Sequence, residues 1–204
     1  MERKKRGDDL GYLFVVGGPG GSGASSISRM LAEHFNLSIV YSGGLFREAV
    51  KERGYENFED FYKNSNEDEL LKLDEEVDSR LIEESKRKDV LMDSKLFACI
   101  AQINEIPCTA KIWLDASLHI RAMRHLGKEN ISSLLVRFIQ YYKIRKDLKK
   151  RWRLDSRRYS KLYGIDYGKP SVYNDIVIDS SNMDENETFN LILRRLEDGQ
   201  YIKK

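Results

Sequence analysis

The feature that most constrains this chain is a glycine-rich segment, GGPGGSGASS, that runs from Gly17 to Ser26. It follows a short apolar run, Leu13 to Val16, and precedes apolar residues at helical spacing. The pattern G-x-x-x-x-G-K-[ST] binds phosphates because its glycines let backbone amides face an anion at the start of a helix. Gly18 and Gly23 occupy the two glycine positions of that pattern. Strand, loop and helix in this order predict a phosphate-binding site.

The lysine of this pattern is missing. Ala24 stands in its place, so the loop lacks the cation that reaches the outer phosphates. The next residue keeps the hydroxyl that ligates Mg²⁺. The predicted phosphate-binding set is Gly18, Pro19, Gly20, Gly21, Ser22, Gly23, Ala24, Ser25 and Ser26, with Ser25 as the metal ligand. Either the loop has lost its chemistry or other side chains supply the charge.

Length and charge restrict the class of protein. A chain of 204 residues is long enough for one substantial core with a small lid. Its 35 basic and 33 acidic residues nearly balance, so no overall field indicates a nucleic-acid-binding protein. Cys99 and Cys108 fit no metal spacing, and residues 1–11 are interpreted as a flexible basic tail with no export signal. We therefore expect a cytoplasmic protein with reduced thiols.

Short apolar or β-branched runs alternate with helical patterns along the chain. The predicted strands are residues 13–16, 38–41, 89–93, 110–116 and 176–179, and Ser117 is placed as a helix N-cap. This alternation predicts a three-layer α/β domain with a five-stranded parallel sheet, in which ligands bind at the carboxyl ends of the strands. That edge would collect the loop, residues 42–47, residues 93–95 and Asp115.

Several side chains at this edge suit phosphate chemistry. Arg47 can pair with a phosphate through its planar fork, although a solvated arginine is an equally weighted alternative. Asp93 can orient Mg²⁺-bound water, and Lys95 can meet a substrate phosphate. His119 and His125 have no metal spacing and are expected to be exposed.

The run from Lys143 to Arg158, KIRKDLKKRWRLDSRR, is strongly basic. It can be a solvated helix face, a nucleic-acid surface with Trp152 for stacking, or a mobile lid that brings arginines to a transferring phosphoryl group. The preceding loop favours the lid, because phosphoryl transfer depends on positioning and on stabilising negative charge.

These segments together resemble the nucleoside monophosphate kinases, and most closely the archaeal-type cytidylate kinases. The resemblance spans about Tyr12 to Leu196, and its markers are GGPGGSGASS, YSGGLFRE, AKIWLDAS, RRYSKLYGID and IVIDSS, in that order. In that group the loop often carries G-T-T-T instead of G-K-S/T. This chain departs from the group at Ala24, at DSK (residues 93–95) where E-G-R is usual, and at the apolar Trp152 and Leu154.

The resemblance implies a single kinase domain over residues 12–204, with a monophosphate-binding segment at about 42–90 and a lid at about 143–168. It implies Mg²⁺ and ATP, and transfer of the γ-phosphoryl group to CMP or dCMP by a monomer that needs neither a membrane nor a nucleic acid. The implied catalytic residues are Arg151, Arg158 and Asp93, and the implied monophosphate-binding residues are Ser42, Arg47, Asp93 and Lys95. The alternatives are a catalytically silent nucleotide-binding protein and an RNA-binding adaptor.

Overall fold

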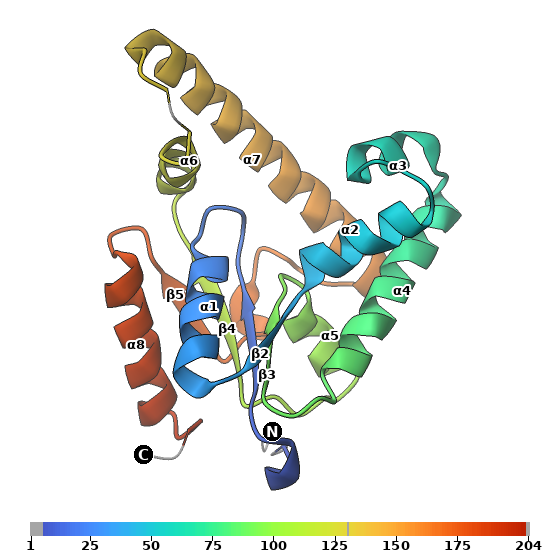
Figure 1. Cartoon of the computed structure of the whole chain (residues 1–204), viewed down its shortest axis with the longest axis vertical. Helices are drawn as coiled ribbons and strands as arrows, with labels where there is room; N and C mark the ends of the chain where they lie inside the picture. The colour runs from blue at the N-terminus through green and yellow to red at the C-terminus, as the bar shows by residue number, and fades with distance from the viewer. Residues whose placement is uncertain (1–5, 130, 203–204) are drawn as a thin grey trace.

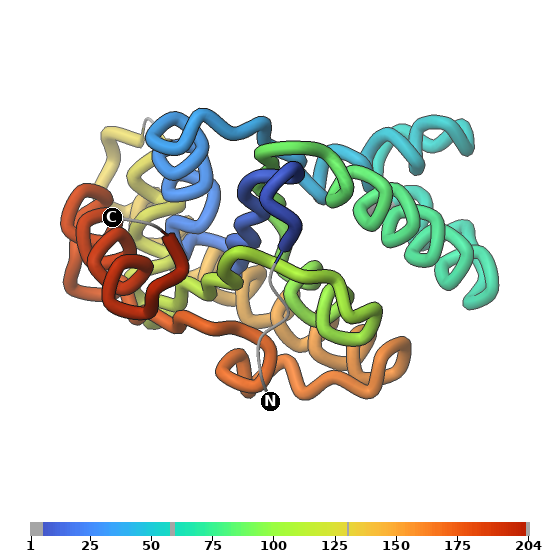
Figure 2. The backbone as a smooth tube through the Cα atoms, turned by 90° about the horizontal axis from the view of Figure 1, so that it is seen from below, coloured from blue at the N-terminus to red at the C-terminus, as the bar shows by residue number. Residues whose placement is uncertain are grey.

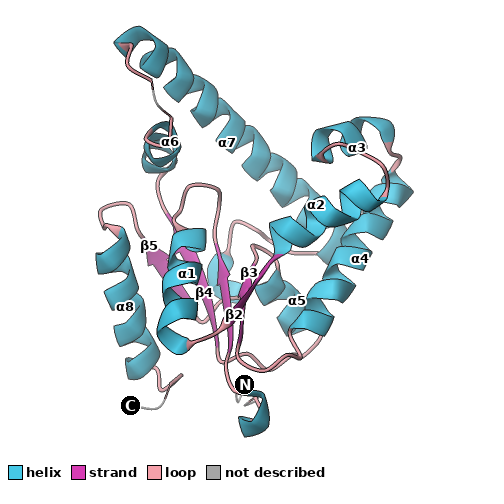
Figure 3. Cartoon of the chain, viewed as in Figure 1, coloured by secondary structure: helices cyan, strands magenta, loops and turns pink. Residues whose placement is uncertain are grey.

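A parallel sheet forms the centre of the molecule (Figures 1 and 3). The computed structural model describes residues 6–129 and 131–202. Its five strands lie in the order β2-β3-β1-β4-β5, and all neighbouring strands are parallel. They are β1 (Leu13–Gly17), β2 (Ser38–Tyr41), β3 (Val90–Asp93), β4 (Ala110–Asp115) and β5 (Ile176–Asp179). The predicted α/β fold with a five-stranded parallel sheet is confirmed, and the predicted strands differ only at their ends.

Helices cover both faces of this sheet. On one face, α1 (Ala24–Phe35) and α8 (Glu185–Asp198) pack against Phe14 and Val16 of the central strand. On the other face, α4 (Glu67–Glu84) and α5 (Phe97–Ile103) share a core with Leu13 and Val15. Successive strand residues point to opposite faces, so one fully buried strand supplies both cores. Figure 2 shows α4 projecting beyond the sheet together with α2 (Ser42–Glu52) and α3 (Phe58–Asn64).

The helix boundaries follow local capping chemistry. Ser117 caps α6 (Leu118–Leu126) as predicted, because its Oγ accepts a hydrogen bond from the Ile120 amide at 3.3 Å. Helix α2 ends at Glu52, and Gly54, with a φ of 82°, follows the cap residue Arg53. The short helices α3 and α5 were not predicted. Five of the seven residues of α5 are buried, so its sequence has no polar face to reveal a helical period.

Helix α7 (Leu134–Tyr163) is a single element of 30 residues, about 45 Å long at the usual helical rise. It crosses the edge of the sheet where the strands end, with α6 beside its start and α2 and α4 beside its end (Figure 1). The basic run from Lys143 to Arg158 lies within this helix, which continues through Lys143 without a break. The lid and monophosphate-segment boundaries therefore stay predictions.

Part of the predicted flexible tail is attached to the domain. Residues 1–5 lie outside the described residues. Arg6 donates hydrogen bonds to the carbonyl oxygens of Ser85, at 2.9 Å, and Arg87, at 2.6 Å. A short 3₁₀ helix, Asp8–Leu10, follows. The chain enters β1 beside the turn before β3, so the Arg6 side chain reaches the backbone carbonyl acceptors of that turn.

Both cysteines are free and buried, with Cys99 5% and Cys108 7% exposed. Burial raises the pKa of each thiol to about 12. Within the described residues, no helix combines the length and the apolar character that crossing a bilayer requires.

Candidate active site

The glycine-rich loop connects β1 to α1 and is packed closely at Gly18. A Cβ on Gly18 would lie 2.3 Å from the Leu114 carbonyl oxygen, which belongs to the neighbouring strand β4. The Ser22 amide donates to the Pro19 carbonyl oxygen at 3.0 Å and closes a turn within the loop. The loop therefore holds a fixed shape at the carboxyl edge of the sheet, where sequence analysis predicted a phosphate site.

The loop ends at the start of helix α1, whose cap residue offers no side-chain acceptor. Gly23 is the N-cap and makes no side-chain hydrogen bond to the first amides of the helix. Uncapped N–H groups and the helix dipole favour an anion at this point. Ala24, the first residue of α1, is 9% exposed, and its methyl group offers no charge to an anion bound there.

Ser25 and Asp93 form the part of the site that suits a metal ion. Asp93 ends β3, which pairs with β1, and its carboxylate is hydrogen-bonded by the Ser25 hydroxyl. Burial raises the pKa of Asp93, and the Ser25 hydrogen bond opposes that rise. Within the described residues, no group of three or more His, Cys, Asp or Glu side chains is arranged to hold a metal. A hydroxyl and one carboxylate nevertheless fit Mg²⁺, which takes its other oxygen ligands from phosphates and water.

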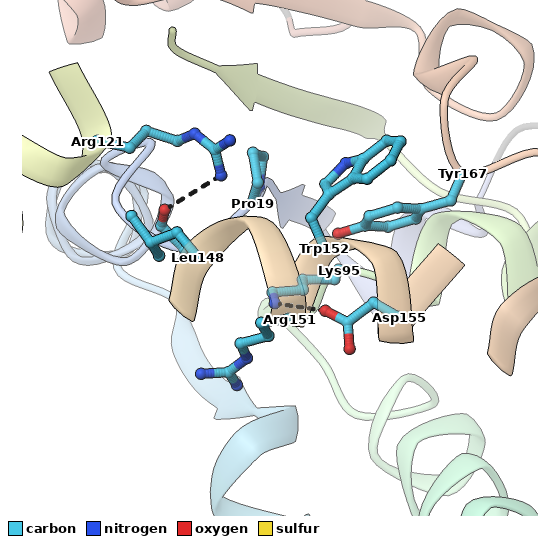
Figure 4. A pocket seen from close by; sticks show the side chains of 9 residues that line it. Pro19, Lys95, Arg121, Leu148, Arg151, Trp152, Asp155 and Tyr167 are labelled. Atoms are coloured by element: carbon cyan, nitrogen blue, oxygen red, sulfur yellow. Dashed lines mark hydrogen bonds and ion pairs between the residues drawn. The ribbon is translucent and has the colours of Figure 1, made fainter. Parts of the chain in front are cut away.

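Helix α7 closes a small cavity over the loop (Figure 4). Within it the Lys95 ammonium lies 3.0 Å from an Asp155 carboxylate oxygen. Arg121 of α6 donates a hydrogen bond to the Gly20 carbonyl oxygen at 3.4 Å. The cavity is lined by Pro19, Gly20, Lys95, Arg121, Leu148, Arg151, Trp152, Asp155 and Tyr167. The loop thus faces cations from two helices and from the turn after β3.

Three buried polar atoms around the loop have no hydrogen-bond partner among the described residues: Ser22 Oγ, Arg121 Nε and His125 Nε2. His125 lies against the loop, since a Cβ on Gly20 would be 3.9 Å from its Nε2. Our expectation that His125 is exposed is therefore wrong, because α6 packs this side chain onto the loop. Burial lowers the pKa of its imidazole. Unpartnered polar atoms cost free energy, so their gathering here fits a polar ligand.

Two of the predicted acceptor residues, Ser42 and Arg47, lie on α2. The Ser42 hydroxyl donates to the Asp93 carbonyl oxygen at 3.1 Å. Arg47 is exposed, with its guanidinium 5.2 Å from the centre of the Tyr41 ring. Arg158 lies 3.5 Å from an Asp74 carboxylate oxygen.

The structure therefore separates residues that sequence analysis grouped together. Arg151 lines the cavity at the loop. Arg158 is instead paired with Asp74 of α4, and its guanidinium carbon lies 5.5 Å from the ring centre of Phe46. Lys95, which we grouped with Arg47, instead lies beside the loop residues.

Sequence analysis did not find the part that α6 plays. Arg121, Arg124 and His125 stand at helical spacing on one side of this helix, and all three contact the loop. The signal was present in the sequence, because a helix that directly follows a strand end starts at the ligand edge.

Comparisons with known proteins identify the family. A family model described as an AAA domain matches residues 16–130. A cytidylate kinase of Methanopyrus kandleri is 33% identical over 189 residues, which cover 90% of this chain and 92% of that protein. The chain belongs to the cytidylate kinase family. A second cytidylate kinase, from Methanocaldococcus jannaschii, is 33% identical over 180 residues, with 88% of this chain and 94% of that protein covered.

Solved structures of shikimate kinases resemble this chain in fold. A shikimate kinase from Bacteroides thetaiotaomicron matches with a TM-score of 0.58 at 10% identity, covering 94% of this chain and 99% of that one. A shikimate kinase from Aquifex aeolicus matches with a TM-score of 0.53 at 17% identity, covering 93% and 98%. These likenesses concern the fold alone. The family resemblance inferred from the ordered motifs is confirmed by the cytidylate kinase relatives.

Proposed function

We propose that this protein transfers the γ-phosphoryl group of ATP to CMP or dCMP and so makes the nucleoside diphosphate. One observation carries the proposal: two proteins named cytidylate kinase are 33% identical to this chain and match about nine-tenths of it. The phosphate-loop geometry and the cations that face it are consistent with such a transfer.

The donor phosphates would lie on the loop. The backbone of residues 20–25 would bind them, helped by the uncapped start of α1. Ser25 and Asp93 would hold Mg²⁺, which neutralises charge on the phosphate oxygens when it is bound. Ser42 and Arg47 are the proposed contacts for the acceptor phosphate, and Arg158 lies on the same side, paired with Asp74.

Arg151 is the arginine best placed for the transferring group. It lines the cavity together with Pro19 and Gly20 of the loop. A guanidinium there would stabilise charge on the phosphoryl oxygens as they pass between donor and acceptor. The acceptor is already an anionic phosphate oxygen, so a general base is not required. Covering of the loop by α7 would exclude water and limit ATP hydrolysis.

Turnover with a panel of monophosphates, ATP and Mg²⁺ tests this function directly. CMP and dCMP should give diphosphates, and UMP and AMP serve as comparison acceptors. Arg151→Ala should lower kcat on the order of 10³-fold, in the range known for arginines that contact a transferring phosphoryl group. Arg153→Ala is the matched control, because this exposed arginine of α7 does not line the cavity.

One outcome would contradict the proposed function, and another would contradict the role of Arg151 alone. Nucleotide binding by the folded protein without any product would favour a catalytically silent binding protein. A fall in kcat of less than about tenfold in Arg151→Ala would remove Arg151 from its role at the transferring group.

A further inference from the structure

The pairing of the central strands fixes Lys95 beside the phosphate-binding loop. Asp93 at the end of β3 lies opposite Val16 of β1, so the turn that follows runs along the start of the loop. The packing there is close: a Cβ on Gly17 would be 2.8 Å from the Ser94 carbonyl oxygen and 3.3 Å from Lys95 Cα. The backbone of Lys95 is therefore held against the loop by the sheet itself.

The Lys95 side chain turns into the cavity at the loop. Its ammonium is directed at Asp155 and shares the cavity with Pro19 and Gly20 (Figure 4). The ion pair is largely shielded from water, since the Lys95 and Asp155 side chains are 25% and 17% exposed. Arg47, the proposed contact for the acceptor phosphate, does not line this cavity. Lys95 is thus placed on the donor side of the site.

The cavity holds more positive than negative charge. Lys95, Arg121 and Arg151 line it, and Asp155 is the single carboxylate among the lining residues. Arg121 is 8% exposed, and its Nε lacks a hydrogen-bond partner among the described residues. A buried N–H donor without an acceptor is costly, and charge-assisted hydrogen bonds to a polyanion would satisfy it. A nucleoside triphosphate on the loop has the charge that this cavity needs.

We propose that Lys95 supplies to the donor phosphates the ammonium charge that the loop lacks at Ala24, and that Asp155 holds this ammonium until the nucleotide binds. The inference rests on the proposed function. Phosphate oxygens replace the Asp155 carboxylate around Nζ, which releases that contact between α7 and the turn after β3. In this arrangement Lys95 compensates for the lysine that is missing from the loop at Ala24.

Lys95→Met separates the donor role from an acceptor role, because it keeps a long apolar side chain and removes the charge. Calorimetric titrations with ATP alone and with CMP alone give the two affinities. We expect the Kd for ATP to rise at least about tenfold, as for the loss of a charge-assisted contact, and the Kd for CMP to stay within about threefold. Turnover should fall on the order of 10²-fold.

Lys161→Met is the matched control. Lys161 of α7 is also ion-paired, with Glu67 of α4 at 2.8 Å, but it does not line the cavity. Both affinities should stay within about threefold in this variant, as for an exposed ion pair. A Lys95→Met protein that lost CMP affinity and kept ATP affinity would place Lys95 at the acceptor and overturn the inference.

Two further variants test the exchange itself. Asp155→Asn frees the ammonium, so ATP should bind about threefold more tightly or better, and weaker binding would contradict the holding role. Ala24→Lys in the Lys95→Met background returns the charge from the loop and should recover at least about tenfold in ATP affinity. A folded double variant without recovery would overturn the compensation.

These readouts also distinguish this inference from the proposed function. A wild-type protein that binds ATP but forms no diphosphate defeats the proposed function, while the ATP titrations still report on Lys95. Unchanged turnover and ATP affinity in Lys95→Met, beside an active wild type, defeat the inference alone.

Discussion

Gly21 shows how strongly a single residue of the loop is constrained. Its φ is 85°, in the left-handed region that residues with a Cβ avoid. A Cβ there would also meet the Arg121 carbonyl oxygen at 2.8 Å and His125 Cδ2 at 3.0 Å. The backbone angle and the packing of α6 therefore both require glycine at position 21. A larger residue would fit only if the loop moved away from α6.

Gly21→Ala should destabilise the protein by about 1–3 kcal/mol and weaken ATP binding, because backbone strain and a steric clash act together. Urea unfolding and ATP titration measure the two effects. Gly127→Ala is the control: Gly127 has a φ of −65°, and a Cβ there would meet the Met123 carbonyl oxygen at an ordinary 3.5 Å. Equal stability of the two variants would show that the Gly21 geometry is not needed.

At the scale of elements, the contact between α4 and α7 is formed by charged and polar pairs. Asp74 pairs with Arg158, and the Tyr163 hydroxyl donates a hydrogen bond to Asp78. The pKa of Asp78 is raised to about 6, chiefly by burial. The Tyr163 hydrogen bond and Arg158 lower it, whereas Asp74 and Glu75 raise it. This contact is therefore sensitive to mildly acidic pH.

Asp78→Asn should make stability less dependent on pH. Between about pH 4 and pH 6 the folded protein keeps the Asp78 proton while the unfolded chain loses it, so wild-type stability falls as pH rises through this window. At about pH 7 the variant should be more stable by about 1–3 kcal/mol, a gain that disappears near pH 4. Urea unfolding across this range measures it, with exposed Asp147→Asn as control. A constant difference at all pH values would contradict the assigned titration.

At the scale of the whole molecule, Arg124 joins segments that are distant in the sequence. Its guanidinium donates to the Ser22 carbonyl oxygen at 2.9 Å and to the Ser180 carbonyl oxygen at 2.7 Å. Ser180 is 2% exposed, and its hydroxyl lies within hydrogen-bond distance of the carbonyl oxygens of Ser22, at 2.9 Å, and of Asp115, at 3.0 Å. The phosphate loop, α6 and the ends of β4 and β5 thus form one hydrogen-bonded unit.

Arg124→Ala should lower the free energy of unfolding by about 2–4 kcal/mol, because several buried carbonyl oxygens lose a charged donor together. ATP affinity should fall as well, since the loop loses its attachment to β5. Arg194→Ala, at an exposed position on α8, should change stability by less than about 0.5 kcal/mol. Thermal unfolding with and without ATP compares the variants. Loss of stability with unchanged ATP affinity would mean that the loop keeps its shape alone.

The sequence predicted the features that depend on neighbouring residues and missed those that depend on distant ones. The β-branched run 176–179 and the cap Ser117 are local signals, and both were found. Helix α5 was missed because burial on all sides erases its period. The Lys95–Asp155 pair joins residues 60 positions apart, so no spacing rule could assign it. The contact of His125 with the loop likewise depends on how α6 packs.

The buried, weakly acidic thiols of Cys99 and Cys108 leave the native chain nearly inert towards alkylation at neutral pH, because the reactive species is the thiolate. A cysteine introduced at an exposed position such as Lys149 would therefore take up a maleimide fluorophore selectively. No native cysteine would have to be removed first. A change in emission on adding nucleotide would then show whether α7 moves, and at what rate.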